Sequence, residues 1–199
     1  MQLLNTLHEN VVHSRRVNSL TQSLLPLLPE IGSVLDVGCG DGWLARRLAE
    51  HRPLSHFCGI DVLVRPDTHI PVSYFDGAQI PFPDDHFDTV LIVDVLHHAD
   101  DPAALLREAK RVARTRVVLK DHTRDGIAAH STLRIMDWVG NAHHGVALPY
   151  NYLSKAEWLQ MCEALELTVD QWIARPRLYG APVDWVCGRS LHFLASLSV

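Results

Sequence analysis

The stretch VLDVGCGDGWLARRLAE, from Val34 to Glu50, decides the fold of this chain. A short apolar run predicts a buried strand, glycines then alternate with other residues, and a helix is expected from Trp43 onward. Glycine lets the backbone turn tightly and lets a ligand approach main-chain N–H groups closely. In a parallel sheet, a strand, a glycine turn and a helix in this order predict a ligand site beyond the carboxyl end of the strand.

The spacing of the glycines indicates which ligand the turn accepts. A dinucleotide-binding turn has the pattern G-x-G-x-x-G, and its third glycine would fall here on Trp43. The bulky indole does not suit a place where backbone must approach a pyrophosphate. The observed pattern is G-x-G-x-G, preceded by Asp36, and an acid beside the loop favours a cationic ligand. Asp61 ends the next predicted strand, where a carboxylate can accept hydrogen bonds from both hydroxyls of a ribose.

Strands and helices alternate along the rest of the chain and predict an α/β fold with a parallel sheet. Strands are expected at Ser33–Val37, His56–Asp61, Val72–Asp76, Phe87–Leu96, Thr115–His122, Leu167–Ile173 and Leu191–Val199. Helices are expected over residues 1–30, Trp43–Glu50 and Pro102–Val112, and after the capping box of Ser154 and Glu157.

Length and composition predict one domain that spans residues 1–199. A mass of 22.3 kDa, with 47% hydrophobic and 21% charged residues, is ordinary for one globular domain and excludes a disordered chain. Residues 1–30 are expected to form a helical cap. Residues 123–153 form a long insertion between core elements, and such insertions are usually functional. We expect this one to cover a substrate pocket.

Net charge, the length of apolar runs and the cysteine pattern indicate which partners and which cellular compartment to expect. A net charge of -5, with no Lys/Arg run, disfavours a nucleic-acid partner. No apolar stretch approaches the length of a membrane span, and we see no signal peptide. The four cysteines form no C-x-x-C pair, as is typical of free thiols in a reduced compartment. These features predict a cytoplasmic protein and leave its oligomeric state open.

At this point two segments show a family resemblance. Asp36–Gly42, followed by the acid in GIDV, resembles the S-adenosylmethionine-binding motif of class I methyltransferases. The downstream segment Asp76–Val112, with DGAQIPFPDDHFDTVLIVDVLHHADDPAALLREAKRV, resembles the type-11 branch, which includes quinone-biosynthesis methyltransferases. The resemblance implies a Rossmann-like fold. Its doubly wound, mostly parallel sheet would have seven strands and an antiparallel hairpin strand at the C-terminus.

The resemblance also implies which residues hold the methionine and ribose parts of the cofactor. Gly38, Cys39 and Gly40 would line the methionine moiety through their backbone. Asp36 would support the loop and the amino group of the ligand. Asp61 would hold the ribose, with Val62 beside it.

A second group of residues is implied for the two ends of the cofactor. Asp76 would accept a hydrogen bond from the adenine amino group, with Gly77 and Ala78 beside the ring. Asp94 and Val95, at the end of the predicted fourth strand, would face the methionine end.

The chain contains thirteen histidines, and five of them could converge above the sheet: His97, His98, His122, His143 and His144. Their spacing is not that of a zinc site, and adjacent histidines on a helix do not face the same way. We therefore expect no metal. A general base is the other interpretation, with His122 as first candidate and His143 as second, because some methyl acceptors must lose a proton.

Taken together, these patterns predict a methyltransferase that uses S-adenosylmethionine and leaves S-adenosylhomocysteine. The polar and aromatic residues of Met136–Tyr152 and the lack of a basic face favour a small organic acceptor, methylated by in-line displacement. Two alternatives stay open at this stage. One is a methyltransferase for protein or RNA, and the other is a non-catalytic regulator or scaffold that binds S-adenosylmethionine.

Overall fold

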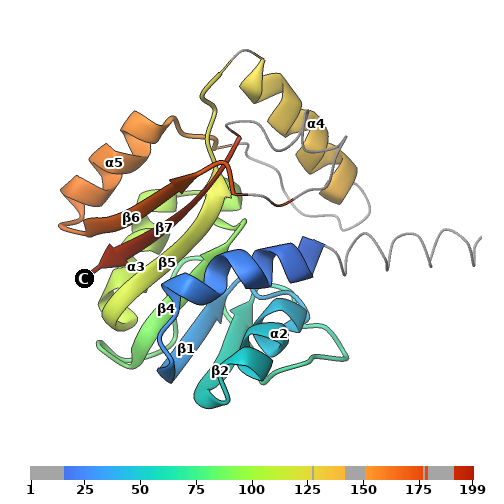
Figure 1. The fold of residues 1–199 in the computed structure, drawn as a ribbon, viewed down its shortest axis with the longest axis vertical. Coiled ribbons are helices and arrows are strands. Elements are labelled where there is room, and N and C mark those ends of the chain that lie inside the picture. The colour runs from blue at the N-terminus through green and yellow to red at the C-terminus, as the bar shows by residue number, and fades with distance from the viewer. Residues whose placement is uncertain (1–15, 127, 142–150, 177, 179–190) are drawn as a thin grey trace, which may run out of the picture.

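The computed structural model describes residues 16–126, 128–141, 151–176, 178 and 191–199 (Figure 1). Its centre is a seven-stranded sheet with the strand order β3-β2-β1-β4-β5-β7-β6. The strands are β1 (Ile31–Val37), β2 (Leu54–Asp61), β3 (Val72–Tyr74), β4 (Phe87–Val93), β5 (Ala113–His122), β6 (Thr168–Ala174) and β7 (His192–Ser198). The five strands from β3 to β5 pair in parallel, and β7 pairs antiparallel with both of its neighbours. The predicted sheet is confirmed.

The strand order creates a crevice next to β1. From β1 the chain proceeds outward through β2 to β3, and β4 then returns to the other side of β1. In such sheets the connections leave β1 and β4 toward opposite faces, which opens a crevice beyond their carboxyl ends. The glycine turn of the sequence lies at this point.

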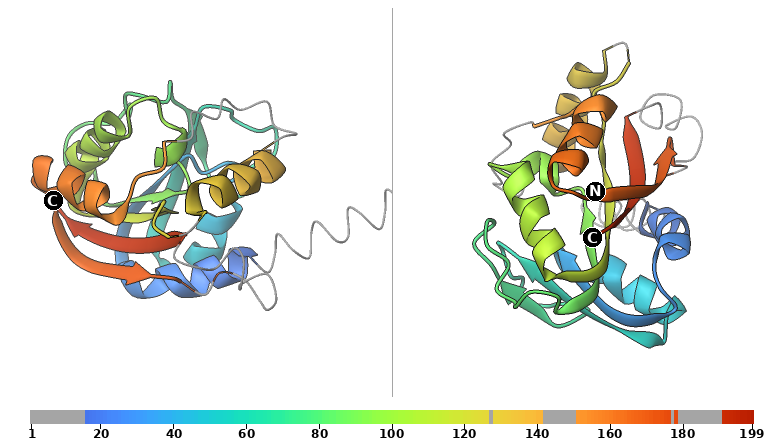
Figure 2. Two further views of the ribbon diagram at one scale, coloured as in Figure 1. Left: turned by 90° about the horizontal axis from the view of Figure 1, so that it is seen from above. Right: turned by 90° about the vertical axis from the view of Figure 1, so that its left-hand side faces the viewer.

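Helices cover both faces of the sheet (Figure 2). The N-terminal helix (residues 16–24) and α2 (Trp43–His51) lie on one face, and α3 (Pro102–Val112) and α5 (Lys155–Ala164) lie on the other. Two 3-10 turns, η1 (Leu25–Leu27) and η2 (Leu96–His98), connect elements, and α4 (Ala129–Asn141) lies in the insertion after β5. None of the helices in the described ranges is long and apolar enough to cross a membrane.

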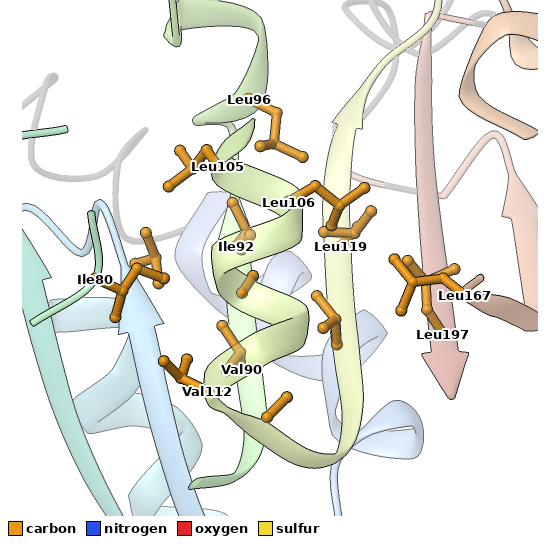
Figure 3. Packing of buried hydrophobic residues seen from close by; sticks show 14 of the residues in the cluster. Ile80, Val90, Ile92, Leu96, Leu105, Leu106, Val112, Leu119, Leu167 and Leu197 are labelled. Carbon is orange, nitrogen blue, oxygen red and sulfur yellow. The ribbon is translucent and has the colours of Figure 1, made fainter. Parts of the chain in front are cut away.

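Strand β4 shows why the core has two halves. Successive side chains of a strand point to opposite faces, so Val90 and Ile92 join the cluster that contains α3, and Leu91 joins the cluster that contains α2. Figure 3 shows the first half, with Leu105 and Leu106 of α3 against the strands. These five side chains are at most 2% exposed. A strand that is buried on both faces explains why this segment is continuously apolar in the sequence.

Helix α5 connects the outer sheet to the functional edge. Its capping box is present, with Ser154 and Glu157 bonded reciprocally as predicted. Trp158 is buried, and its Nε1–H donates to the carbonyl oxygen of His122 at 3.0 Å. The helix therefore fixes the last residue of β5.

Three predictions about helices and strands differ from the structure by more than two residues. Strand β4 was predicted to reach Leu96 and ends at Val93, because Asp94 turns the backbone into the left-handed region with a φ of 58°. The insertion was predicted without a helix and contains α4. Of the predicted helix over residues 1–30, the helical part within the described residues is 16–24, after which Pro26 lies in a 3-10 turn. Residues 1–15 lie outside the described residues.

Candidate functional site

The glycine loop connects the end of β1 to the start of α2. Gly38, Gly40 and Gly42 have φ angles of 71°, 61° and 77°, in the left-handed region that favours glycine. A Cβ at Gly38 would lie only 2.4 Å from Val95 Cγ2. The loop therefore presents bare backbone to the crevice, as the sequence pattern predicts.

Hydrogen bonds fix this loop against β2. The N–H of Gly38 donates to the carbonyl oxygen of Ile60 at 2.8 Å. The N–H of Gly40 donates to Asp61 Oδ2 at 2.7 Å, and Asp61 Oδ1 accepts from the N–H of Leu63 at 2.9 Å. The acid predicted to hold a ribose thus lies at the edge of the glycine loop.

A pocket of about 320 Å³ opens against the loop at the carboxyl ends of β1 and β4. Four of the predicted cofactor residues line it: Gly38, Cys39, Gly40 and Asp94. The other lining residues are Arg16, Val17, Leu20, Asp41, Trp43, Leu44, Arg65 and Val93. Bare glycine backbone, aliphatic walls and charged groups of both signs fit the methionine end of S-adenosylmethionine.

The residues predicted for the adenine end form a turn after β3. Asp76 Oδ1 accepts hydrogen bonds from the N–H groups of Ala78 and Gln79 at 2.9 and 2.8 Å, and these bonds lower the pKa of Asp76. Gly77 has a φ of 88°, and a Cβ there would lie 3.3 Å from Val62 Cγ1. The turn therefore lies against the first residue after β2, which brings the predicted adenine and ribose residues together.

Asp36 lies in β1, just before the glycine loop, and is buried. Burial raises the pKa of its carboxyl to about 8, and the negative charge of Asp61 contributes to the rise. At neutral pH the carboxyl therefore holds a proton. A cation bound beside it would favour the ionised form, so Asp36 can couple the binding of a cation to the release of a proton.

Asp94 directly follows β4 and reaches the pocket. Its carboxylate accepts a hydrogen bond from Arg16 Nη2 at 2.7 Å and forms an ion pair with Lys120 Nζ. Burial raises the pKa of Asp94, but the positive charges of Lys120 and Arg16 oppose this effect and hold the pKa well below its ordinary value. The carboxylate therefore stays ionised between two cations.

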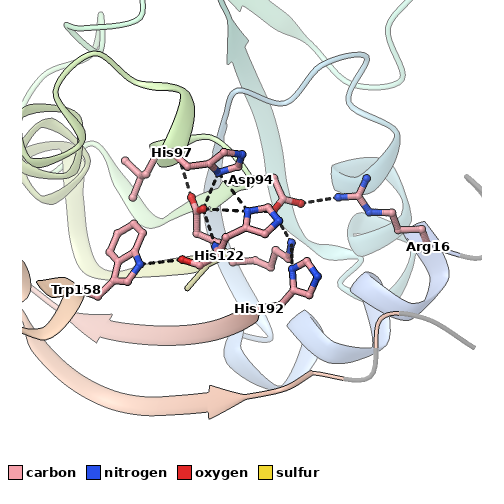
Figure 4. A network of polar contacts seen from close by, with 9 residues as sticks. Arg16, Asp94, His97, His122, Trp158 and His192 are labelled. Atoms are coloured by element: carbon pink, nitrogen blue, oxygen red, sulfur yellow. Dashed lines mark hydrogen bonds and ion pairs between the residues drawn. The ribbon is translucent and has the colours of Figure 1, made fainter. Parts of the chain in front are cut away.

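A buried network of histidines and an aspartate lies behind Asp94 (Figure 4). His97 Nδ1 lies 2.6 Å from Asp121 Oδ1 and 3.4 Å from His122 Nδ1. Asp121 also accepts hydrogen bonds from the N–H groups of Leu96 and His122 at 3.1 and 2.7 Å. Burial would raise the pKa of Asp121, but its contacts with the two histidines keep it below its ordinary value. The network therefore holds η2 against the end of β5.

Lys120 of β5 and His192 of β7 complete the network. The Lys120 side chain is fully buried, and its Nζ lies 3.2 Å from His192 Nδ1. Burial lowers the pKa of Lys120, and the charge of Asp94 opposes that shift. Burial and the neighbouring Lys120 charge lower the pKa values of both His192 and His122. Both imidazoles are therefore neutral at neutral pH.

The network contains one group of potential metal ligands within the described residues. Ligand atoms of His97, Asp121 and His122 lie within 4.8 Å of one another. Even without the histidines, the two carboxylates of the network, Asp94 and Asp121, are already balanced by two basic side chains, Arg16 and Lys120. Because an added cation would leave excess positive charge in a buried region, we propose no metal here.

The structure places the first base candidate next to Asp94, and the second lies outside the residues that the structure describes. His122 Nδ1 lies 3.6 Å from Asp94 Oδ1, behind the pocket wall. His143 lies outside the described residues. Sequence reasoning missed Lys120 and His192. The only signal for Lys120 was a lysine in an apolar strand, and His192 arrives from the far end of the chain.

Comparison with known families assigns the chain to one of them. Residues 10–171 match the family model described as a methyltransferase domain. The chain belongs to this family. The resemblance that the sequence motifs carry is therefore confirmed, and the cofactor of the family and its fold is S-adenosylmethionine.

Two curated relatives and one solved structure show which proteins this methyltransferase domain is similar to. The chain is 30% identical over 121 residues to 27-O-demethylrifamycin SV methyltransferase of Amycolatopsis mediterranei. The aligned residues cover 53% of this chain and 44% of that protein. It is 27% identical over 142 residues to the ubiquinone/menaquinone biosynthesis C-methyltransferase UbiE of Cupriavidus necator, covering 62% and 58%. The chain spans about half the length of these curated relatives.

The solved structure is a complex between the Haloferax volcanii Trm112 methyltransferase activator and a methyltransferase. It superposes with a TM-score of 0.72 and 16% identity, over 96% of this chain and 93% of that chain. At this identity the likeness shows the Rossmann-like methyltransferase fold.

The ion pair between Asp94 and Lys120 gives a stability prediction for this domain. Asp94→Asn leaves the buried Lys120 ammonium without its carboxylate, so we expect the free energy of unfolding to fall by about 3 kcal/mol. The double variant Asp94→Asn/Lys120→Met removes both charges and should lose less. Urea unfolding at pH 7.5 measures both. A double variant that loses as much stability as Asp94→Asn, or more, would contradict this prediction.

Proposed function

We propose that this chain is an enzyme that transfers a methyl group from S-adenosylmethionine to a small organic acceptor by in-line displacement. The observation that carries the proposal is the pocket between the glycine loop and Asp94, with Asp61 at its edge. When bound, the cofactor supplies a methyl group activated by a sulfonium leaving group, and S-adenosylhomocysteine remains after transfer. The protein contributes alignment and the exclusion of water.

Under this proposal, different residues of the site contact different parts of the cofactor. The backbone of Gly38, Cys39 and Gly40 lies along the methionine moiety, with Asp36 and Asp94 near its positive groups. Val95 packs against the glycine loop and keeps the turn after β4 close to that end.

The other half of the cofactor lies toward β2 and β3. Asp61 accepts the ribose hydroxyls, since a carboxylate has about four acceptor sites and one bond to Gly40 leaves others available. Asp76, Gly77 and Ala78 lie beside the adenine, next to Val62.

Three observations support a small acceptor. Both curated relatives described above are named for acceptors of low molecular mass, a rifamycin derivative and a quinone precursor. The net charge of -5 offers little attraction to RNA. Tyr152, from the insertion, is buried with its ring centroid 5.7 Å from that of His97 and 6.1 Å from that of His122. The insertion therefore packs against the network behind Asp94, as we expect of a segment that covers the site of a small acceptor.

The alternatives differ in what a methyl-labelled cofactor would modify. A protein or RNA methyltransferase would label macromolecules from an extract, and a non-catalytic regulator would bind the cofactor and label nothing. We expect label in small phenols, quinols or carbon acids. Label in RNA or protein alone would overturn the proposed acceptor class.

We further propose that His122 accepts the proton of acceptors that must lose one. A neutral imidazole has a lone pair that can accept a proton, and His122 lies next to Asp94, which lines the pocket. His143, outside the described residues, remains the second candidate for this role.

The ribose role of Asp61 is tested by cofactor binding. Asp61→Ala should weaken S-adenosylmethionine binding at least tenfold, about 1.4 kcal/mol, because it removes the acceptor for the ribose hydroxyls and the bond to Gly40. Calorimetric titration measures the change. Asp67→Ala, an exposed acid in the same link, should leave the affinity unchanged, and NAD should not bind. Equal affinities of the two variants would contradict the role of Asp61.

The raised pKa of Asp36 gives a pH prediction. Its carboxyl, with a pKa of about 8, is protonated at pH 7, and a bound cation would lower that pKa. Binding of S-adenosylmethionine at pH 7 should therefore release a proton, and affinity should rise as the pH increases toward 8. Titration in two buffers of different ionisation enthalpy measures the release. Asp36→Asn should show less release, since only the amino group of the ligand would then titrate. Equal release in both proteins would exclude Asp36.

The role of His122 is tested by turnover of an acceptor found in the labelling screen. His122→Ala should lower kcat by about 10²-fold or more. The affinity for S-adenosylhomocysteine should stay within about twofold, since a proton acceptor does not hold the cofactor. In the wild-type enzyme the rate should stay level as the pH falls through 6.5, because the pKa of His122 is lowered. His56→Ala, an exposed histidine of β2, is the matched control. Full turnover by His122→Ala would remove it from this role.

A further inference from the structure

One cation on the pocket wall has no role in the site as described so far. Arg65 lies in the link after β2 and is among the residues that line the pocket. Its Nη2 and Nε lie 3.9 and 4.0 Å from the position that a Cβ of Gly40 would occupy. The guanidinium thus lies over the part of the glycine loop where a side chain would otherwise stand.

Arg65 differs from the other arginine of the pocket in its partners. Arg16 is committed to Asp94, at 2.7 Å. Arg65 forms neither a hydrogen bond nor an ion pair with any other residue in the described ranges, although Asp41 and Asp61 belong to the same two loops. An exposed arginine without a partner is ordinary on a surface. On the wall of a ligand pocket, its five N–H donors are available to an anion.

The charges of the pocket indicate which anion this is. The amino-acid end of S-adenosylmethionine carries an ammonium and a carboxylate. Asp94 on the pocket wall, and Asp36, which is buried just before the glycine loop, suit the ammonium. The carboxylate needs a donor, and Lys120, which is fully buried behind Asp94, is not among the residues that line the pocket. Arg65 lies beside Gly40 and can supply two parallel N–H bonds to a carboxylate.

We propose that Arg65 binds the carboxylate of the cofactor across Gly40 and so selects adenosyl ligands that carry a complete amino-acid end. Glycine at position 40 leaves the space beside the guanidinium open, because a Cβ there would come into van der Waals contact with Arg65. The inference rests on the proposed function, since it takes the pocket to be the methionine site.

The test compares two ligands that differ only in the carboxylate. S-adenosylhomocysteine carries it, and the decarboxylated analogue S-adenosyl-3-thiopropylamine keeps the ammonium and the adenosine but lacks it. Calorimetric titration gives the Kd of each ligand for the wild-type protein, Arg65→Gln and Arg65→Lys. Arg46→Gln is the matched control, because Arg46 lies on the exposed side of α2 and outside the pocket.

Arg65→Gln should weaken S-adenosylhomocysteine binding at least fivefold and change the binding of the decarboxylated analogue by less than twofold. Arg65→Lys, which keeps a charge but not the bidentate geometry, should fall between wild type and Arg65→Gln for S-adenosylhomocysteine. An equal loss for both ligands, or no loss for either, would overturn the inference and leave the cofactor site intact. If the wild-type protein, shown to be folded, bound neither ligand, the cofactor site itself would fail and the inference with it.

Discussion

The site depends on how the glycine loop is held between neighbouring strand ends. Glycines with left-handed backbone let the chain turn directly from β1 into α2. The carboxyl end of β2 fixes that turn through Ile60 and Asp61. The absence of a side chain at Gly38 lets Val95, after β4, approach the loop. Three strand ends are therefore joined in one unit, and the pocket forms where they meet. A bulkier loop would separate them.

A second constraint is the burial of charge behind the pocket. Asp94 keeps its negative charge because Arg16 and Lys120 lie against it, and Asp121 is held by its contacts with His97 and His122. Buried ion pairs often contribute little net stability, because desolvation offsets their attraction. Their presence at the floor of a ligand pocket fits a functional requirement for a fixed, ionised carboxylate beside a neutral base. The same requirement explains why the apolar strand β5 ends in three polar residues, Lys120 to His122.

The elements that the sequence predicted well are those with a strong local pattern. The strands around β1, the helix α2 and the capping box of α5 follow from apolar runs, glycines and a serine–glutamate pair, and the structure confirms them. The end of β4 was predicted wrongly because the apolar run continues through Leu96, whereas one left-handed residue, Asp94, breaks the strand. Helix α4 was missed because it lies inside a long insertion, where neither a capping box nor a proline marks its start.

The sequence by itself determined the sheet type, the glycine turn, the acid at the end of β2 and the family, because each depends on residues close together in the chain. Only the tertiary structure decided that Asp94 lies between Arg16 and Lys120, that His192 reaches β5, and that Arg65 faces the pocket over Gly40. Those contacts join residues from separate strands and loops. They depend on strand order and register, which hydrophobic periodicity does not encode.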